Sequence, residues 1–245
     1  MRRPYLLAAS LLLASPTMAI AEDFKVVTEI FLDQKKVAET QTFFYGGRVY
    51  DKKVPAMGES VDLSHYDPAR QEVVRINRLS KMRAKVTTEW LKKLSLEISA
   101  RGVTNRAMRP LIEVQLKVAQ QDAQSLVLSS EPIVYRVTTV SPKDASAVFA
   151  YLDFADQFAQ INAVTPPNLP PFARMQLNSA LRNQKTLPRE IERTTFTRGR
   201  KQTVVAKQTY YWVLSKSDVR FCDYVGGLLS DRNYQDVSLT TFMER

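Results

Sequence analysis

The side chains that most often serve as nucleophile and base are scarce in this sequence. The chain has one histidine, His65, and one cysteine, Cys222. A hydrolytic site needs a nucleophile within hydrogen-bond distance of its base, so such a site here must pair His65 with Cys222 or with a serine. His65 stands between Ser64 and Tyr66 in a strand-like stretch, with no motif around it. We therefore assign no catalytic residue, and a hydrolase built on His65 is the third of three hypotheses.

The carboxylates form no recognisable site either. First-row metal ions prefer clusters of histidine and cysteine, and the sequence has none. Asp51, Asp62 and Asp67 offer oxygen ligands but follow no calcium-loop pattern. Glu190 and Glu192 share one face of a predicted strand, where like charges usually face solvent. The sequence predicts no metal and no cofactor, and it favours a protein that is not an enzyme.

Aromatic side chains are the one feature that points to a binding site. They concentrate in residues 43–66 and 210–212. Their simplest role is packing between strands. The alternative is an apolar cavity under a curved sheet that holds an acyl chain or another hydrophobic ligand. For that alternative we select these ligand-binding residues: Trp90, Tyr211, Trp212, Phe44 and Tyr66.

Residues 1–21 are typical of an export signal. The basic residues Arg2 and Arg3 precede an apolar stretch and then small residues up to Ala21. The apolar stretch is shorter than the roughly 20 residues that a transmembrane helix needs. We predict cleavage after Ala21 and a periplasmic or secreted mature chain, residues 22–245, with no transmembrane anchor. Export by the general route or by the twin-arginine route stays open.

The mature chain is expected to be basic. Without residues 1–21 it keeps 33 basic against 25 acidic residues, a net charge of +8. Such a charge suits anionic surfaces, so our second hypothesis is a cell-envelope protein that binds an anionic polymer or another protein. The basic residues are scattered among acidic ones, which is typical of a solvated surface and indicates no specific nucleic acid.

The elements that must position these side chains begin with strands. Residues 24–86 are rich in β-branched and aromatic residues and are divided by turn signals such as Gly46-Gly47 and Asp67-Pro68. This pattern predicts an antiparallel meander of five or six strands.

The sequence period then changes to that of helices. Thr87 is predicted to cap a helix with Trp90 and Leu91 on its apolar face and Gly102 at its end. A second helix is predicted over residues 106–121. The two helices should form a hairpin that packs on the sheet.

The second half is predicted to mix strands and helices. Strands at 125–130 and 133–140 precede a helix that Ser141 caps and that extends to about residue 161. The proline-rich residues 164–171 mark an internal boundary within a single domain, and a short helix follows them.

The last part of the chain is predicted to be a long hairpin, residues 187–197 and 201–214, with a turn at residues 198–200. Residues 217–229 suit a helix capped by Ser217 and Asp218, although a strand at 219–225 stays open. The polar tail, residues 231–245, is expected to be loosely held.

The order of these elements resembles the half-open β-barrels of the periplasmic lipoprotein-carrier superfamily. The turn Tyr66-Asp67-Pro68 and the segment 187–191 before the late hairpin carry the resemblance. It implies an α+β fold, with a curved antiparallel sheet and helices packed across one face. It also implies our first hypothesis, an apolar or amphiphilic ligand such as a lipid in a cleft between sheet and helices. Segments 44–51 and 66–70 are also similar to uncharacterised secreted bacterial proteins, which implies no function.

Overall fold

The computed structural model describes residues 23–55, 58, 61–104, 108–164, 169–197 and 200–244. The expected export signal, residues 1–21, lies outside these ranges. Within them, one sheet contains these strands: β1 (Phe24–Leu32), β2 (Lys35–Tyr45), β3 (Arg48–Lys53), β4 (Asp62–Asp67), β5 (Glu72–Asn77), β6 (Met82–Thr87), β7 (Lys117–Gln121), β8 (Ser125–Ser130), β9 (Ile133–Val140), β10 (Leu187–Thr197), β11 (Arg200–Tyr211) and β12 (Gln235–Val237).

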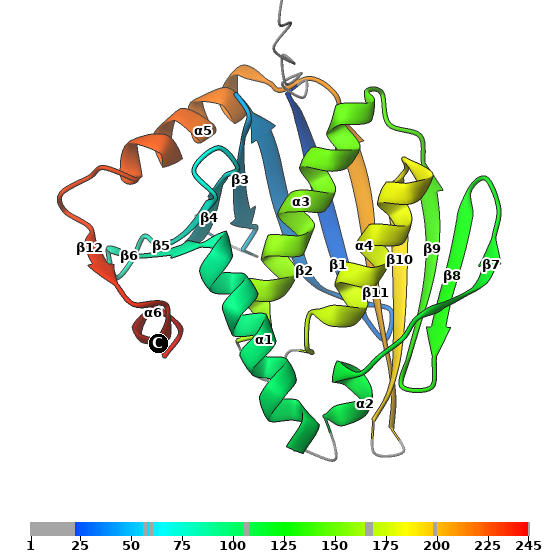
Figure 1. The fold of residues 1–245 in the computed structure, drawn as a ribbon. Helices are drawn as coiled ribbons and strands as arrows, with labels where there is room; N and C mark the ends of the chain where they lie inside the picture. Colours follow the sequence, from blue (N-terminus) through cyan, green and yellow to red (C-terminus); the bar gives the residue numbers. More distant parts are fainter. Residues whose placement is uncertain are drawn as a thin grey trace, which may run out of the picture.

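The sheet is open, with the strand order β12-β6-β5-β4-β3-β2-β1-β11-β10-β9-β8-β7 (Figure 1). All neighbouring strands are antiparallel except β12, which lies parallel to β6. One edge is therefore the three-residue strand β12. The other edge is β7, whose pairing with β8 is shifted by a bulge between Val118 and Gln120.

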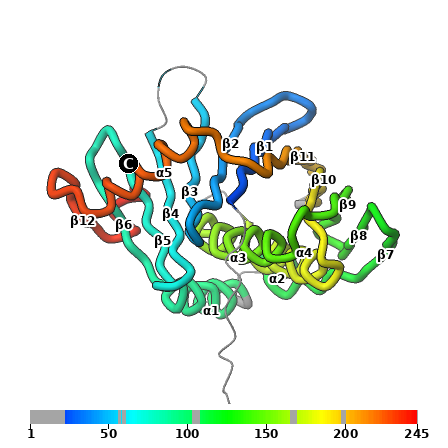
Figure 2. The backbone as a smooth tube through the Cα atoms, turned by 90° about the horizontal axis from the view of Figure 1, so that it is seen from above, coloured from blue at the N-terminus to red at the C-terminus, as the bar shows by residue number. Residues whose placement is uncertain are grey.

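Helices lie on both faces of this sheet. The helices of the described residues are α1 (Thr88–Thr104), α2 (Arg109–Ile112), α3 (Ala145–Asn162), α4 (Phe172–Gln184), α5 (Lys216–Leu228) and α6 (Leu239–Met243). The sheet curves around α3 and α4, with α1 on the same side, and α5 lies against the opposite face (Figure 2). The expected α+β class, a curved and mostly antiparallel sheet with helices packed across one face, is confirmed, and α5 adds a helix on the other face that was not expected. No helix in the described ranges is long and apolar enough to cross a membrane.

The first six strands form the predicted antiparallel meander. Gly46 and Gly47 connect β2 to β3 as a two-residue turn, and their φ angles of 58° and 72° suit glycine. The late hairpin of β10 and β11 is also confirmed, although its predicted turn residues Arg198 and Gly199 lie outside the described ranges.

Alternation along the strands builds two cores, because successive side chains point to opposite faces. On the inner face, Phe24, Val26 and Phe44 pack beneath α3 in the larger cluster. On the outer face, Phe43 and Tyr50 pack with Cys222 of α5 in the smaller cluster. Helices α1, α3 and α4 therefore cover the inner face of the sheet.

The predicted helix over residues 106–121 is wrong. Among the described residues of this stretch, only Arg109–Ile112 are helical, and residues 117–121 form β7 instead. The spacing that suggested a long helix reflects the burial of Leu111 and Ile112 in this single turn and of Val114 in the segment after it. Pairing with β8 supplies the backbone partners that a helix would otherwise provide.

Two predicted helix ends are also wrong. Gly102 does not end α1, which continues to Thr104, and a Cβ at Gly102 would overlap the side chain of Ile112. Gly102 thus permits the close approach of α2. Ser141 does not cap α3, because the chain stays non-helical until Asp144, which is extended at the N-cap position.

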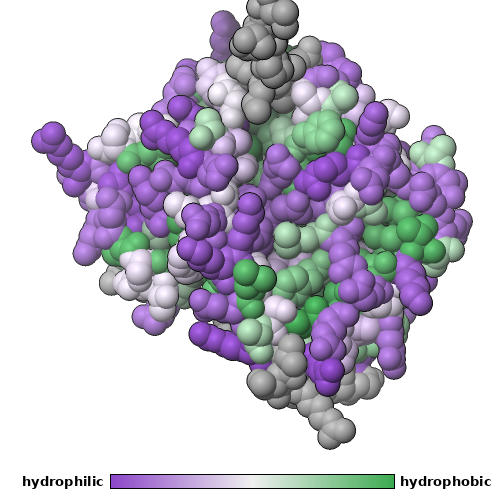
Figure 3. Space-filling view, in the orientation of Figure 1, coloured by the Kyte–Doolittle hydropathy of each residue, from purple (hydrophilic) through white to green (hydrophobic). Residues whose placement is uncertain are grey.

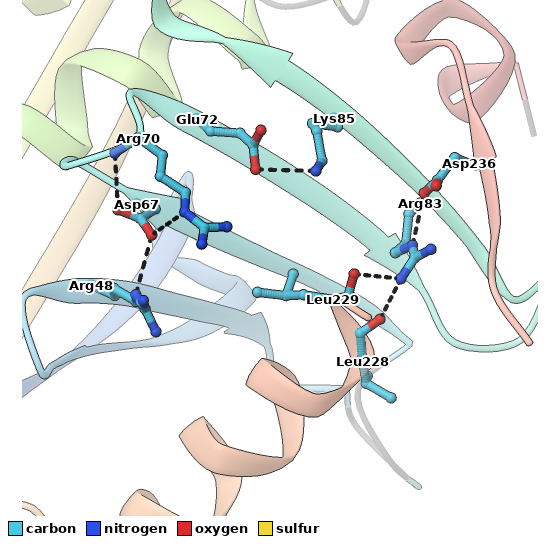
Figure 4. Close-up of polar contacts among 9 residues, drawn as sticks. All are labelled: Arg48, Asp67, Arg70, Glu72, Arg83, Lys85, Leu228, Leu229 and Asp236. Carbon is cyan, nitrogen blue, oxygen red and sulfur yellow. Dashed lines mark hydrogen bonds and ion pairs between the residues drawn. The ribbon is translucent and has the colours of Figure 1, made fainter. Parts of the chain in front are cut away.

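The C-terminal segment is ordered by its contacts, so the expected loose tail is wrong. Residues 216–228 form the helix α5 rather than a strand, and its N-cap is Ser215 instead of the predicted Ser217, with Asp218 completing the reciprocal capping box. Beyond it, β12 pairs with β6, and Leu239 and Phe242 of α6 are buried. Arg83 of β6 holds this segment through the following contacts (Figure 4): Nε donates to Asp236 at 2.8 Å, and Nη1 donates to the carbonyls of Leu228 and Leu229 at 2.8 and 2.6 Å.

Candidate functional site

A cavity of about 470 Å³ lies between the inner face of the sheet and helices α3 and α4. Its floor is formed by six adjacent strands, from β3 through β2, β1, β11 and β10 to β9. Leu111 of α2 and residues 169–171 before α4 complete the wall. Figure 3 shows hydrophobic surface between α1 and α4 on this side of the molecule, interrupted by hydrophilic residues.

The cavity begins where the large aromatic rings of the inner face end. In β1 the fully buried Phe24 is followed along the inner face by Thr28, which lines the cavity. In β2, Phe44 is in the core whereas Thr42 and Thr40 line the cavity. Aromatic side chains thus fill one end of the inner face of these two strands, and threonines border the cavity at the other.

The roof is apolar and comes from two helices. On α3, Phe154, Ala155, Phe158 and Ala159 face the cavity, which is the spacing of one helical face. Ala173 of α4 faces it from the other side. The rest of the lining is mixed, because polar side chains that include three threonines, Asn162 and Gln208 interrupt the apolar residues. Ligand-binding pockets likewise combine apolar walls with polar groups that fix the orientation of the ligand.

Two arginines are the principal charged groups at one side of the cavity. Arg193 of β10 and Arg174 of α4 both line it and are half-buried. The Nε atom of Arg193 is buried and has no hydrogen-bond partner in the described part of the chain. Tyr135 of β9 lies beside both: burial raises the pKa of Tyr135, and the positive charges of Arg193 and Arg174 act against that rise. This side of the cavity is cationic.

Asp51 of β3 supplies a carboxyl group at the far side of the cavity. Burial raises the pKa of Asp51 to about 6, although a hydrogen bond from Thr42 Oγ1 at 2.6 Å and the charge of Arg75 act in the opposite direction. Asp51 and Arg193 are separated by four strand spacings, roughly 19 Å across the sheet. They also lie at different levels along the strands, because Asp51 aligns through Thr42 and Val26 with Tyr210, whereas Arg193 pairs with Val204. The two ends of the cavity therefore differ in chemical character.

Three of the five aromatic residues selected from the sequence lie in the inner core. Phe44 stacks on Phe24 with ring centroids 4.1 Å apart, and Trp212 stacks on Tyr210 at 5.8 Å. Tyr66 is 6% exposed, and burial raises its pKa to about 12. None of the three belongs to the cavity lining, although Phe44 contacts Phe154 of the roof.

The other two selected residues lie at the surface. Trp90 on α1 is 41% exposed and Tyr211 at the end of β11 is 47% exposed. Tyr211 points away from the inner core. On the side to which it points, Lys25 Nζ lies 5.2 Å from the centroid of the Tyr211 ring. The structure thus does not gather the five residues into one site, and their contact with a ligand stays a prediction.

His65 and Cys222 do not form the arrangement that a hydrolase requires. Neither ring nitrogen of His65 has a hydrogen-bond partner among the residues described, so no described serine or cysteine is activated by it. Burial lowers the pKa of His65 to about 4 and raises the pKa of the Cys222 thiol to about 12. A catalytic cysteine needs the opposite shift, toward the thiolate.

The sequence contains a signal for Arg193, one of the two arginines that line the cavity. Ile191 and Arg193 alternate with Glu190 and Glu192, so the arginine lies on the strand face that also carries an apolar residue. A charge on the inward face of a strand is uncommon, because burial of an unpaired charge is costly. Arg174 offered no comparable signal, since half-buried helix arginines are common at surfaces.

The described residues contain no group of three or more histidine, cysteine, aspartate or glutamate side chains placed to hold a metal ion. The chain gives no match to protein-family models or to curated proteins. The site is thus defined by its own residues as a cavity beneath α3 and α4 with a cationic side.

Proposed function

We propose that this is an exported protein that binds an amphiphilic ligand, with the ligand's apolar chain in the cavity beneath α3 and α4. The single observation that carries the proposal is the cavity itself, which lies within the inner core and has an apolar roof. Its volume of about 470 Å³ falls in the range of small-molecule binding sites. Burial of an apolar chain there would be favourable in proportion to the apolar area removed from water.

Native mass spectrometry of the protein purified from its own host tests the proposal directly. A discrete added mass that organic solvent removes would support it and would identify the ligand. A clean protein mass, together with no binding of the neutral apolar dye Nile red, would contradict it. Binding of Nile red with a clean mass would instead show that the ligand is lost on purification.

A substitution that fills the cavity provides the matched test. Ala206 of β11 faces the cavity, whereas Val205 beside it points to the opposite face of the sheet. Ala206→Phe is expected to weaken Nile red binding by about tenfold or more, because an added ring competes for the space of the ligand. Val205→Phe should leave binding unchanged. Equal affinity in both variants, measured by fluorescence titration, would place the dye elsewhere.

A further inference from the structure

Arg174 and Arg193 approach the cavity from different elements and meet at the same side of it. Arg193 projects from β10 between Tyr135 of β9 and Val204 of β11, which are its partners in strand register. Arg174 projects from the first turn of α4. Both line the cavity, so a ligand bound there would contact one guanidinium group from the sheet and one from helix α4.

Neither arginine has a counter-charge within the described residues. No carboxylate there forms an ion pair with Arg193, and its buried Nε has no partner. Arg174 donates from Nε to Asn178 Oδ1 at 2.9 Å, which is a neutral acceptor. Asn178 in turn donates to Asp156, whose carboxylate already pairs with Arg182 at 2.9 Å. This series of hydrogen bonds orients the Arg174 guanidinium without neutralising its charge.

Two half-buried cations at one side of a cavity are electrostatically costly. Some other buried or partly buried cations in the described ranges have a carboxylate, as Lys25 has Asp218 at 3.0 Å and Arg83 has Asp236 at 2.8 Å, whereas Arg75, like Arg193, has a buried Nε without a partner. Asp51, the carboxyl group that lines the same cavity, interacts with Thr42 and Arg75 instead. An anion at the cationic side would offset the repulsion and accept hydrogen bonds in the forked geometry that guanidinium groups favour.

We propose that the ligand of this cavity is an anionic amphiphile, with a carboxylate or phosphate held between Arg174 and Arg193 and an apolar chain extending under α3. This inference rests on the proposed function and adds the charge and orientation of the ligand. The head group lies at the side of Arg193, and the chain extends toward Thr28 and Thr42. Fatty acids and phospholipids share this chemistry, and the test below distinguishes the two sources.

Displacement of Nile red by three matched amphiphiles tests the inference: dodecanoate, dodecyl phosphate and dodecanol. We expect the two anions to displace the dye at concentrations about tenfold or more below that of the alcohol, because each charge-assisted hydrogen bond adds affinity. Tighter binding of dodecanoate indicates a fatty-acid source, and tighter binding of dodecyl phosphate indicates a phospholipid source. Equal displacement by all three would overturn the inference and leave the proposed function standing, whereas absence of dye binding would contradict both.

Substitution of Arg174 and Arg193 tests whether these two residues cause the preference for anionic amphiphiles. Arg193→Gln and Arg174→Gln should each weaken the two anions by about tenfold and leave dodecanol unchanged. Arg136→Gln is the matched control, because Arg136 is exposed on β9 and pairs with Glu192 at 3.0 Å, away from the cavity. If Arg193→Gln fails to fold, Arg193→Lys keeps the charge but loses the fork, and it should retain dye binding with a reduced anion preference. An anion preference that survives in all folded variants would refute the assignment.

Discussion

Asp51 and His65 are buried ionisable side chains on opposite faces of the sheet. Asp51 lies on the inner face beside Thr42, and His65 lies on the outer face, edge-on to the ring of Tyr50 at 5.0 Å. Burial disfavours the charged form of each group. The pKa of Asp51 therefore rises to about 6, whereas the pKa of His65 falls to about 4.

These two shifts are expected to have opposite effects on stability in the same pH range. Asp51 contributes stability below its unfolded pKa, near 4, and that stability is lost as the pH rises through about 6. His65 contributes stability above its unfolded pKa, near 6.5, and that stability is lost as the pH falls through about 4. Each effect is on the order of 3 kcal/mol, so the two largely cancel.

Two single variants separate the contributions. In Asp51→Asn the free energy of unfolding should rise from pH 4 to pH 6.5, because only the His65 effect remains. In His65→Leu it should fall over the same range, because only the Asp51 effect remains. Urea denaturation at several pH values measures both slopes. Parallel slopes in the two variants would show that other groups dominate.

At the scale of elements, Arg83 joins the C-terminal segment to the sheet. Arg83 is 8% exposed, and its guanidinium contacts Asp236 and the carbonyls of Leu228 and Leu229 (Figure 4). Arg83→Ala is expected to lower the free energy of unfolding by about 2–4 kcal/mol, because it removes three charge-assisted hydrogen bonds and takes this donor from the Leu229 carbonyl, whereas the Leu228 carbonyl keeps the Asp231 N–H. Hydrogen exchange should show the loss concentrated in residues 229–244.

Lys85 provides the control for this prediction. It lies on the same strand and the same face as Arg83, but its ion pair with Glu72 at 3.5 Å is exposed (Figure 4). Exposed ion pairs contribute little, so Lys85→Ala should cost less than about 0.5 kcal/mol. Comparable losses in the two variants would contradict the view that burial gives Arg83 its importance.

The strands of this protein could be predicted from the sequence better than its connections. Alternation and turn residues such as Gly46-Gly47 are local signals, and the meander and the late hairpin follow from them. The segment around Leu111 could not be predicted in the same way, because its apolar residues suit a helix in isolation and the pairing with β8 decides the outcome. The order of the C-terminal tail likewise depends on Arg83, which lies about 150 positions earlier.

The candidate site was predicted in position but not in composition. A cleft between the curved sheet and its helices was expected, and the cavity lies there. Three of the aromatic residues chosen for it, among them Phe44, pack in the neighbouring core, and the other two, Trp90 and Tyr211, lie at the surface. The cationic side depends on Arg174 and Arg193, which belong to a helix and a strand and line one cavity only in the folded chain.

At the scale of the whole molecule, the basic net charge supports a separate prediction. The full sequence has a formal net charge of +10, yet many exposed basic residues pair with acidic ones, as Lys36 does with Glu29 at 2.6 Å. Binding of an anionic polymer such as alginate should therefore be weak and should decline steeply between low and physiological salt, because exposed charges are screened. Sedimentation with the polymer at several ionic strengths measures this. Salt-independent binding would indicate a specific site.

The two edges of the sheet have a consequence for self-association. An exposed, flat edge strand is a template on which a strand from another molecule can add, and a wide open sheet has two such edges. Here one edge is only three residues long, and the other carries Lys117 and a bulge that leaves Ala119 out of the pairing with β8. The native protein therefore resists growth into fibrils from its edges, and aggregation on heating should begin only after strands inside the sheet separate.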